Sequence, residues 1–467
     1  MIKTELRDLF LNHFAQGIKP QNHFKIGIEH EKFLFNAKNQ RADYPLLEKL
    51  LKSLAENSWQ EMRENNHLIG LKKDNKNITT EPGFQFELSG QTHESIHEVC
   101  AESSGYLKEI NRSAENHNIK HLSIGYDPFN SLKDAPKSPK ARYKIMTEEM
   151  PKTGKLSLEM MYQTCGLQVN LDYKSERDFV EKFKISNYIV PILIAIFANS
   201  PFKHNSLSSY HSYRNFIWQS TARGGIMPIV FEEMSFEKYF DFIINYPLLF
   251  IIKEEQYQKA ENKTFNDFMN GQLSYLPTIK NFQDHLSTIF TEVRLKQYIE
   301  IRSLDTCDWG CICNGPAFLT GLLYNDLEET LSIIKKWKKE AEKLRKNTEN
   351  FDTNYQFYLK NLNTITQYKN LKEDLTGNNL YVHRTIIKCL RFLQGYDYLS
   401  DGVDIDNYET INSESVTVKG VIASQINETN EILFTEIMKS DILDELTGEE
   451  IISTMAIFLN TKLNDRE

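Results

Sequence analysis

The chain has 467 residues, of which 40% are hydrophobic and 25% are charged, and its formal net charge is −9 at pH 7. This composition is ordinary for a globular protein, and the length allows one large domain or two to three lobes. An acidic chain in which no basic face dominates argues against a nucleic-acid partner. Six cysteines are too few for a disulfide scaffold and indicate a reducing compartment.

The first segment, MIKTELRDLFLNHF, predicts an amphipathic helix and has neither an apolar signal core nor an Arg- and Ser-rich transit pattern. The longest apolar run, 189–198 (IVPILIAIFA), is too short to span a bilayer and predicts a buried helix. We therefore expect a cytoplasmic protein that has no membrane partner.

Four segments alternate apolar and polar residues in the way that is typical of half-buried β-strands. They are 25–35 (KIGIEHEKFLF), 81–89 (EPGFQFELS), 164–173 (TCGLQVNLDY) and 298–304 (YIEIRSL). The polar side of each strand carries carboxylates, amides or arginine. Carboxylates grouped in this way repel one another unless a cation lies among them, so the pattern predicts a divalent-metal site on a sheet. A sheet with an exposed charged face has the same pattern.

The polar sides of these strands supply both of the groups that phosphoryl transfer from ATP requires, carboxylates for Mg²⁺ and basic groups for phosphate. The basic groups are Arg294, Lys296 and Arg302, in the sequence EVRLKQYIEIRS. The candidate metal ligands, with two amides as neutral neighbours, are Glu29, Glu31, Glu81, Glu87, Glu300, Gln168 and Asn170.

Between the strands, the sequence predicts helices over 94–117, with Thr92 as the cap, and over 178–199. The segments 133–151 and 202–223 predict loops.

Each of these two loops carries a candidate binding group. Arg142, in the first loop, is predicted to contact the nucleotide, although a solvated loop fits the same residues. Arg214 and Trp218, in the second, combine a bidentate fork with an aromatic wall, as recognition of an amino-acid carboxylate requires. A structural arginine fits that spacing equally well.

After Pro316 the sequence becomes helical, with predicted helices over 319–347, 381–395 and 429–439. We therefore expect two parts. Residues 1–316 would form a catalytic domain around the sheet, and residues 317–467 a mainly helical region packed on it.

Two local motifs suggest other chemistry. His93-Glu94-Ser95-Ile96-His97 matches the H-E-x-x-H pattern of zinc peptidases, but it falls at the start of a predicted helix, where a helix start with His97 partly buried is the expected role. Cys307, Cys311 and Cys313 lack a second ligand pair for zinc, so free thiols are expected, with a redox pair as the alternative. No P-loop and no G-x-G-x-x-G after a strand occurs, so an ATP site would be of another kind.

A series of motifs in the first 330 residues resembles glutamate–cysteine ligase, most closely the form of plants and many proteobacteria. These motifs are GIEHEKFLF, TTEPGFQFELSG, ARYKIMTEEMP, MYQTCGLQVNLDY, LSSYHSYRNFIW, FTEVRLKQYIEIRS and GPAFLTGLLYNDL. The resemblance implies an α+β fold related to the glutamine synthetase catalytic domain, in which an antiparallel, bowl-like sheet is surrounded by helices.

The resemblance also implies a reaction. Mg²⁺-ATP phosphorylates the γ-carboxylate of L-glutamate, and the amine of L-cysteine then attacks the acyl phosphate. The product is γ-glutamylcysteine, in the first step of glutathione biosynthesis. A sister ligase that joins glutamate to another amine is the alternative within this class, and a zinc peptidase using His93 and His97 is the alternative outside it. A monomer or homodimer is expected.

The family's roles are transferred to matching positions as implied by the resemblance. Glu29, Glu31, Glu81, Glu87 and Glu300 would hold metal. Arg294, Lys296 and Arg302 would bind ATP, and Arg214, Trp218, Gln168 and Asn170 the amino-acid substrate. Glu31, Lys296 and Arg302 are expected to carry catalysis.

The chain departs from the family pattern at two places beside the expected pocket. Residues 219–225 are shorter than the family's loop and lack its aspartates, and 303–307 replaces its Gly-rich stretch. The identity of the acceptor amine depends on such positions. Phe84 also replaces the second glycine of the family's EPGG.

Overall fold

The computed structural model describes residues 2–152, 154–254, 256–348, 350, 353 and 387–420. The chain divides into two compact units, Met1–Ala341 and Glu342–Glu467, which are described separately. The predicted helix over 429–439 lies outside the described residues, and so does the first part, 381–386, of the one before it. The expected boundary near residue 316 stays a prediction.

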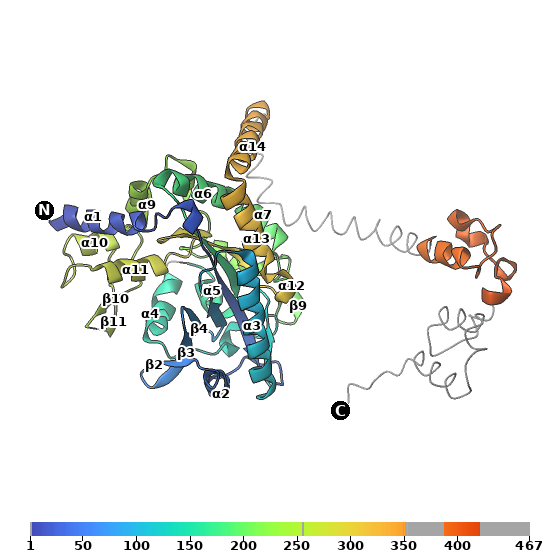
Figure 1. Cartoon of the computed structure of the whole chain (residues 1–467), viewed down its shortest axis with the longest axis horizontal. Coiled ribbons are helices and arrows are strands. Elements are labelled where there is room, and N and C mark those ends of the chain that lie inside the picture. Colours follow the sequence, from blue (N-terminus) through green and yellow to red (C-terminus); the bar gives the residue numbers. More distant parts are fainter. Residues whose placement is uncertain are drawn as a thin grey trace. The chain divides into compact units, whose positions relative to one another are not determined.

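The first unit is built on a nine-stranded sheet in the order β12-β13-β7-β1-β5-β4-β3-β2, with β6 also paired to β1 (Figure 1). All of its pairings are antiparallel. The strands are β1 Ile26–Phe35, β2 Gln60–Glu64, β3 His67–Lys73, β4 Lys76–Thr80, β5 Phe86–Ser89, β6 Lys120–Leu122, β7 Gly166–Leu171, β12 Val293–Leu295 and β13 Ile299–Asp305. Two hairpins, β8 Phe202–Lys203 with β9 Ser206–Leu207 and β10 Phe250–Lys253 with β11 Gln256–Lys259, lie outside it.

The helices surround this sheet. They are α1 Ile2–Ala15, α2 Tyr44–Ala55, α3 Ile96–Glu115, α4 Ala141–Glu149, α5 Ser157–Gln163, α6 Glu176–Tyr188, α7 Val190–Ile196, α8 Tyr213–Gln219, α9 Phe236–Ile243, α10 Phe265–Met269, α11 Ile279–Ser287, α12 Trp309–Ile312, α13 Asn314–Thr320 and α14 Leu327–Asn347. Short 3₁₀ turns cover Gln21–His23, Leu132–Asp134, Met150–Lys152 and Pro228–Phe231, and Gly321–Asn325 is a π-helix. The expected fold class, α+β with an antiparallel sheet and helices outside, is confirmed.

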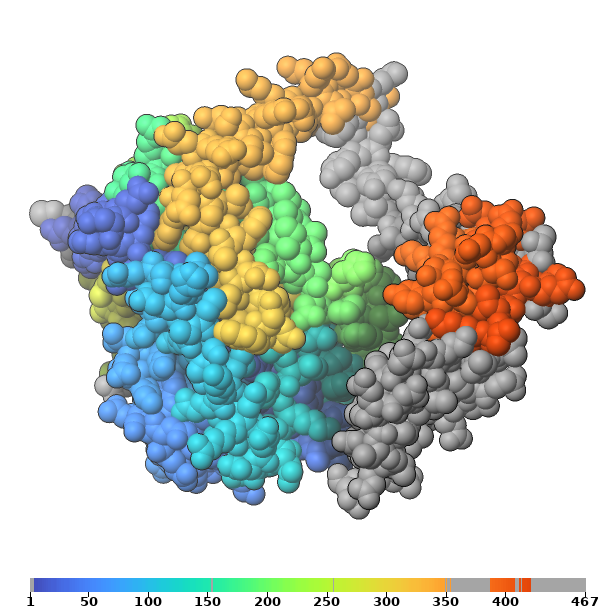
Figure 2. Space-filling view, turned by 45° about the vertical axis from the view of Figure 1, so that its right-hand side comes forward, coloured from blue at the N-terminus to red at the C-terminus, as the bar shows by residue number. Residues whose placement is uncertain are grey.

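The apolar side of the sheet forms the core, as the alternation predicts. Ile28, Val169 and Ile301 are each at most 1% exposed and belong to one cluster with side chains of α1, α6, α7 and α13. A second cluster packs α2 and α3 against β3, β4 and β5. Figure 2 shows α12 and α13, in yellow, beside the light-blue α3 on the surface. Burial of this kind contributes about 25 cal/mol per Å² of apolar surface.

The strand register brings the predicted polar residues together. Glu31 of β1 lies opposite Glu87 of β5, and Glu29 lies opposite Gln168 of β7. Asn170 of β7 lies opposite Glu300 of β13. Because directly paired residues share a face of the sheet, the four polar strand sides form one continuous surface.

Several predicted element boundaries are wrong, each for a local reason. Strand β5 begins at Phe86 because residues 81–85 form a turn, in which Phe84 adopts a left-handed φ of 57° that glycine would favour. Helix α3 begins at Ile96 and is capped by Ser95, which forms a capping box with Glu98, so Thr92 is not the cap. The helix predicted over 178–199 is two helices, α6 and α7, and Pro191 lies in the first turn of the second, where proline is tolerated.

Both predicted loops contain helices. Residues 141–149 of the first form α4, and residues 213–219 of the second form α8, whose N-terminus is capped by Ser212. Short helices of this kind have weak sequence signals because tertiary packing stabilises them more than residue propensity does.

In the second unit, the described residues 387–420 begin with a helical segment that ends at residue 395. A β-bridge pairs Leu399 with Val416, and two 3₁₀ turns cover Ile405–Thr410 and Ser413–Ser415. Tyr398 is 2% exposed, and its carbonyl accepts from the Thr417 amide at 3.2 Å. Among the described residues, we find no helix with the length and apolar character needed to cross a membrane.

Candidate active site

A cavity of about 160 Å³ opens at the polar surface of the sheet. The predicted site residues that line it are Glu31, Glu81, Arg142, Gln168, Arg214, Trp218 and Arg302. They come from β1, the turn before β5, α4, β7, α8 and β13. Six other predicted residues are not in the cavity lining. Glu29, Glu87, Asn170, Arg294 and Glu300 lie on strands of the same sheet, and Lys296 lies in the turn between β12 and β13.

One end of this surface is acidic. Within the described residues, none of Glu29, Glu31, Glu81 and Glu87 forms an ion pair with a basic side chain. Their contacts come from neutral donors. Glu31 accepts from the Gly166 amide, and Glu87 Oε1 accepts from Ser89 Oγ at 2.9 Å.

The electrostatics of this acidic end follow from burial without counter-charges. Burial, and then the neighbouring Glu81 carboxylate, raise the pKa of Glu31 to about 7. The same two causes raise the pKa of Glu87 well above its ordinary value. Arg214 and Arg302 act on Glu31 in the opposite direction, but burial and Glu81 outweigh them.

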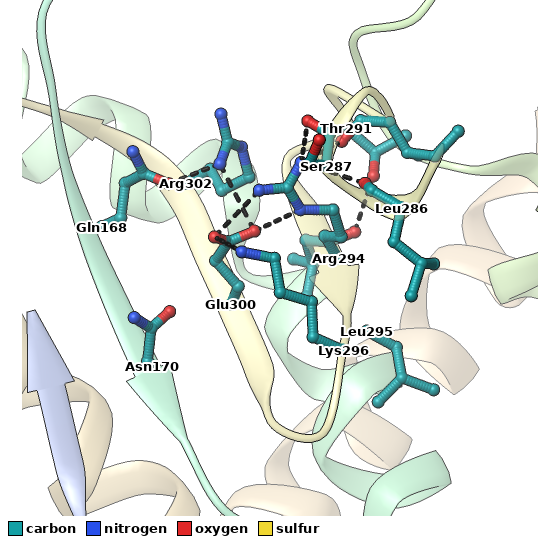
Figure 3. A network of polar contacts seen from close by, with 12 residues as sticks. Gln168, Asn170, Leu286, Ser287, Thr291, Arg294, Leu295, Lys296, Glu300 and Arg302 are labelled. Atoms are coloured by element: carbon teal, nitrogen blue, oxygen red, sulfur yellow. Dashed lines mark hydrogen bonds and ion pairs between the residues drawn. The ribbon is translucent and has the colours of Figure 1, made fainter. Parts of the chain in front are cut away.

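The other end of the surface is basic and centres on Glu300, which is fully buried (Figure 3). Arg294 binds its carboxylate through two nitrogens, with Nη2 2.9 Å from Oε1. Lys296 Nζ lies 3.0 Å from Oε1, and Arg302 Nη1 lies 3.3 Å from Oε2. Burial opposes ionisation of Glu300, but Arg294, Lys296 and Arg302 outweigh it and lower its pKa well below the ordinary value.

The two amides of β7 join these ends. Gln168 Oε1 accepts from Arg302 Nη1, and Asn170 Nδ2 donates to Glu29 Oε1 at 3.1 Å. Figure 3 shows Gln168 at the arginine cluster and Asn170 further along the same strand, apart from it. The Asn170 Oδ1 atom is buried and has no hydrogen-bond partner.

Arg214 and Trp218 share one wall of the cavity. The guanidinium carbons of Arg214 and Arg302 lie 4.8 and 5.2 Å from the centre of the Trp218 ring. Arg214 is 2% exposed and donates from Nη2 to the Arg302 carbonyl at 2.9 Å. Within the described residues its Nε and Nη1 atoms have no hydrogen-bond partner, although Nη1 lies 3.9 Å from Asp305 Oδ1, so two nitrogens of a buried cation can still donate.

Arg142 reaches the acidic end through a residue that the sequence analysis did not single out. Its Nη2 donates to the Tyr143 hydroxyl at 2.7 Å, and that hydroxyl donates to Glu81 Oε2 at 3.0 Å. The hydroxyl therefore bridges a basic and an acidic group. Its position directly after Arg142 in ARYKIM was the available signal, but only the helix geometry of α4 shows its contact.

Sequence reasoning also missed the apolar wall of the cavity. It is formed by Met146, Met160, Met161, Phe250 and Phe290. Met146 and Met161 stand in the quoted motifs, although methionine on a helix more often packs in a core than lines a site.

The zinc alternative is not supported. His93 lies before α3 and contacts Glu102 at 3.1 Å, whereas His97 is exposed, so the expectation that it is partly buried is wrong. Across the part of the chain that the structure describes, no three His, Cys, Asp or Glu side chains stand together as metal ligands would.

The cysteines differ from the expected free thiols. The structure pairs Cys307 with Cys311 and Cys100 with Cys313, and of the described cysteines it leaves Cys165 and Cys389 free.

The fold and cavity define an α+β enzyme whose site places carboxylates and basic groups on one sheet surface. Residues 25–353 match the model of the glutamate-cysteine ligase family 2, and the chain belongs to this family. It is 41% identical to glutamate–cysteine ligase B, chloroplastic, of Oryza sativa subsp. japonica, over 72% of this chain and 69% of that protein. The expected family and ligase class are confirmed.

The chain is also similar to other relatives, to a solved structure and, near its C-terminal end, to a second domain model. The chain is 40% identical to the chloroplastic glutamate–cysteine ligases of Nicotiana tabacum, over 72% of this chain, and Arabidopsis thaliana, over 71%, and covers 66% of each. It thus spans just under two thirds of the length of these two relatives. A glutamate–cysteine ligase of Francisella tularensis in complex with AMP aligns over 68% of this chain and 67% of its own, with 13% identity and a TM-score of 0.40. Residues 413–467 match a DSHCT (NUC185) domain.

The expectation of a cytoplasmic protein is wrong. It is contradicted by the relatives of rice, tobacco and Arabidopsis thaliana described above, which are named chloroplastic. The sequence argument failed because a low cysteine count indicates a reducing environment without distinguishing one reducing compartment from another.

Proposed function

We propose that this protein joins L-glutamate to L-cysteine with Mg²⁺-ATP and forms γ-glutamylcysteine. Membership of the ligase family supports the use of ATP and of small-molecule substrates. One observation carries the rest of the proposal. Buried and half-buried carboxylates without ion-pair partners among the described residues, and a cluster of basic groups, share one sheet surface beside the cavity, as a site for a metal-bound polyphosphate requires.

The acidic end supplies carboxylates for a divalent cation, although no three of them stand together as ligands within the described residues. Glu31 is half-buried and Glu87 is buried, their pKa values are raised, and no basic side chain in the described structure pairs with them, so an external cation would stabilise their charged forms. Oxygen ligands are those that Mg²⁺ prefers. We assign Glu29, Glu31, Glu81 and Glu87 to this role. The metal-binding role predicted for Glu300 stays a prediction. The structure gives it less support than it gives the other four, because Arg294 and Lys296 already donate to the Glu300 oxygens.

The basic groups are assigned to the nucleotide. Arg142, Arg294, Lys296 and Arg302 would neutralise the charge that develops on the transferred phosphoryl group. The γ-carboxylate of glutamate attacks the γ-phosphorus, and ADP leaves. The amine of cysteine then attacks the acyl carbon and loses a proton, and inorganic phosphate leaves.

The amino-acid substrate is assigned to the wall that contains Arg214. Its two nitrogens that have no hydrogen bond among the described residues, Nε and Nη1, suit a carboxylate. Trp218 and Gln168 line the same cavity, and Asn170 lies further along β7 from Gln168. No side chain acts as a covalent nucleophile in this scheme, so catalysis consists of positioning and charge neutralisation by Glu31, Lys296 and Arg302. A monomer or homodimer remains the expectation for the assembly.

The test is ADP release with Mg²⁺-ATP and L-glutamate, with cysteine and then other amines added one at a time. We expect turnover to depend on cysteine and product analysis to show γ-glutamylcysteine. Turnover with another amine alone would keep the metal and phosphate assignments and move the protein to a sister ligase. No ADP release with any acceptor would contradict the proposed function.

A further inference from the structure

A buried carboxylate with no role in the scheme above lies behind the cavity wall. Asp305, at the end of β13, is 1% exposed. Its Oδ2 accepts from the Asn199 amide at 2.8 Å and from Ser200 Oγ at 2.6 Å, and its Oδ1 accepts from Ser212 Oγ at 3.0 Å. A Cβ at Gly125 would lie 2.5 Å from the Asp305 carboxyl carbon, so the absence of a side chain at Gly125 makes room for this group.

A β-bulge in β13 directs Asp305 toward this wall. Between Ile301 and Leu304 the strand advances three residues while β7 advances two, from Val169 to Leu167. Leu304 therefore joins the apolar core, and Asp305 takes the face that Arg214 occupies.

The hydrogen bonds of Asp305 converge on Arg214. Ser200 Oγ, which donates to Asp305, accepts from the Arg214 amide at 3.1 Å. Ser212, the other side-chain donor, is the N-cap of α8, the helix that carries Arg214. Asp305 Oδ1 also lies 3.9 Å from Arg214 Nη1. The Asp305 carboxylate thus binds the two serines that hold the Arg214 backbone and the N-terminus of α8, and it also lies near the Arg214 guanidinium.

We propose that Asp305 is a positioning residue that holds Arg214 in the orientation in which its unpartnered N–H groups bind the carboxylate of the amino-acid substrate. This inference rests on the substrate role assigned to Arg214 under the proposed function. A buried guanidinium without a counter-charge is costly, and Arg302 places a second positive charge on the same indole ring. Without Asp305, Arg214 would move toward solvent or toward another carboxylate.

The experiment is a double-mutant cycle with Arg214→Ala, Asp305→Asn and the double variant, assayed by ADP release. Asp305→Asn should raise the KM for glutamate roughly tenfold to a hundredfold, as loss of a charged contact does, and leave the KM for ATP within about twofold. Arg214→Ala should raise the KM for glutamate at least as much. The double variant should equal Arg214→Ala, because Asp305 acts only through that arginine.

A matched control and a milder variant separate positioning from folding. Asp178 is also a buried carboxylate, paired with Lys182 at 2.8 Å outside the cavity lining, so Asp178→Asn should lower thermal stability without changing the KM for glutamate. Ser200→Ala removes one of the three hydrogen bonds to Asp305 and should shift the KM for glutamate in the same direction by less. This variant keeps the test valid if Asp305→Asn does not fold.

A second readout does not require turnover. In a chain whose other tryptophans, Trp59, Trp309 and Trp337, are replaced by phenylalanine, Trp218 emission reports the guanidinium beside it. Asp305→Asn should shift this emission in the direction in which Arg214→Ala shifts it.

The outcomes distinguish the inference from the function. Additive effects on KM, or an unchanged KM and emission in Asp305→Asn, would overturn the role of Asp305. Absence of wild-type turnover would contradict the proposed function, while the emission comparison would still decide whether Asp305 positions Arg214.

Discussion

The two ends of the polar sheet surface hold the same residue type and shift its pKa in opposite directions. At the acidic end, Glu31 is half-buried and Glu87 is buried, neither has an ion-pair partner among the described residues, and burial raises their pKa values. At the basic end, Glu300 is fully buried, more so than either, yet three basic side chains lower its pKa. The counter-charge, not burial, decides the difference. The chain therefore neutralises the basic end by itself, and the proposed cation would neutralise the acidic end.

The largest expected effect tests the acidic end. Glu31→Gln keeps the side-chain shape and an oxygen that can accept from the Gly166 amide, but it removes the charge. We expect turnover to fall at least about a thousandfold, because loss of a metal-binding carboxylate costs several kcal/mol of transition-state stabilisation. ADP release measures this, and circular dichroism checks that the variant is folded.

Glu94→Gln is the control for this variant, because Glu94 is exposed and pairs only with Lys25, at 2.8 Å. It should have normal turnover. Near-normal turnover of a folded Glu31→Gln protein would remove Glu31 from the metal site.

The second prediction tests the basic end. Arg302→Ala leaves Glu300 paired with Arg294 and Lys296, so the hairpin β12–β13 should stay intact. We expect kcat/KM for ATP to fall by a factor that corresponds to about 2–3 kcal/mol of transition-state stabilisation, the size of a charge-assisted hydrogen bond. The KM for glutamate should change less. The exposed Arg63→Ala is the control. An unchanged ATP dependence in Arg302→Ala would exclude Arg302 from the phosphate site.

The third prediction concerns stability against pH. In the unfolded chain Glu31 loses its proton near pH 4.5, whereas in the metal-free folded chain its pKa is about 7. Between these values the folded state binds more protons, so the free energy of unfolding contributed by Glu31 falls as pH rises, by roughly 2 kcal/mol from pH 5 to 7. Mg²⁺ should stabilise the protein more at pH 7.5 than at pH 5.5, because it favours the charged carboxylate.

Thermal melts with Mg²⁺ and with a chelator, at both pH values, measure this effect. Glu31→Gln serves as the reference and should have a shallower pH dependence. An equal effect of Mg²⁺ at both pH values would contradict the view that the acidic end awaits a cation.

The smallest expected effect concerns the bridge between acidic and basic groups. Tyr143→Phe removes the hydroxyl that donates to Glu81 and accepts from Arg142. We expect kcat/KM for ATP to fall by about tenfold at most. This corresponds to a loss of about 1 kcal/mol of transition-state stabilisation, because one neutral hydroxyl contributes on that order. Tyr188→Phe, outside the cavity lining, is the control. A loss as large as that of Glu31→Gln would mean that the hydroxyl takes part directly in the reaction.

Sequence predictions that depend on local alternation along one strand agree with the structure, whereas those that depend on tertiary packing do not. Alternation places Glu29, Glu31, Gln168, Asn170 and Glu300 on the polar side of their strands, because side chains of a strand alternate regardless of what packs against it. It does not predict the turn at Glu81 or helices α4 and α8, because local caps and packing stabilise those short elements.

The sequence by itself therefore determined the family, the polar residues of the sheet and their chemical types. Only the tertiary structure decided which strands are neighbours, and hence that Glu31 lies opposite Glu87 while Glu300 lies among basic groups. It also decided the role of Asp305. Strict alternation assigns Asp305 to the apolar face, and the bulge before it reverses that assignment. A bulge depends on how two strands pair, and strand pairing is a contact between distant residues that no local pattern contains.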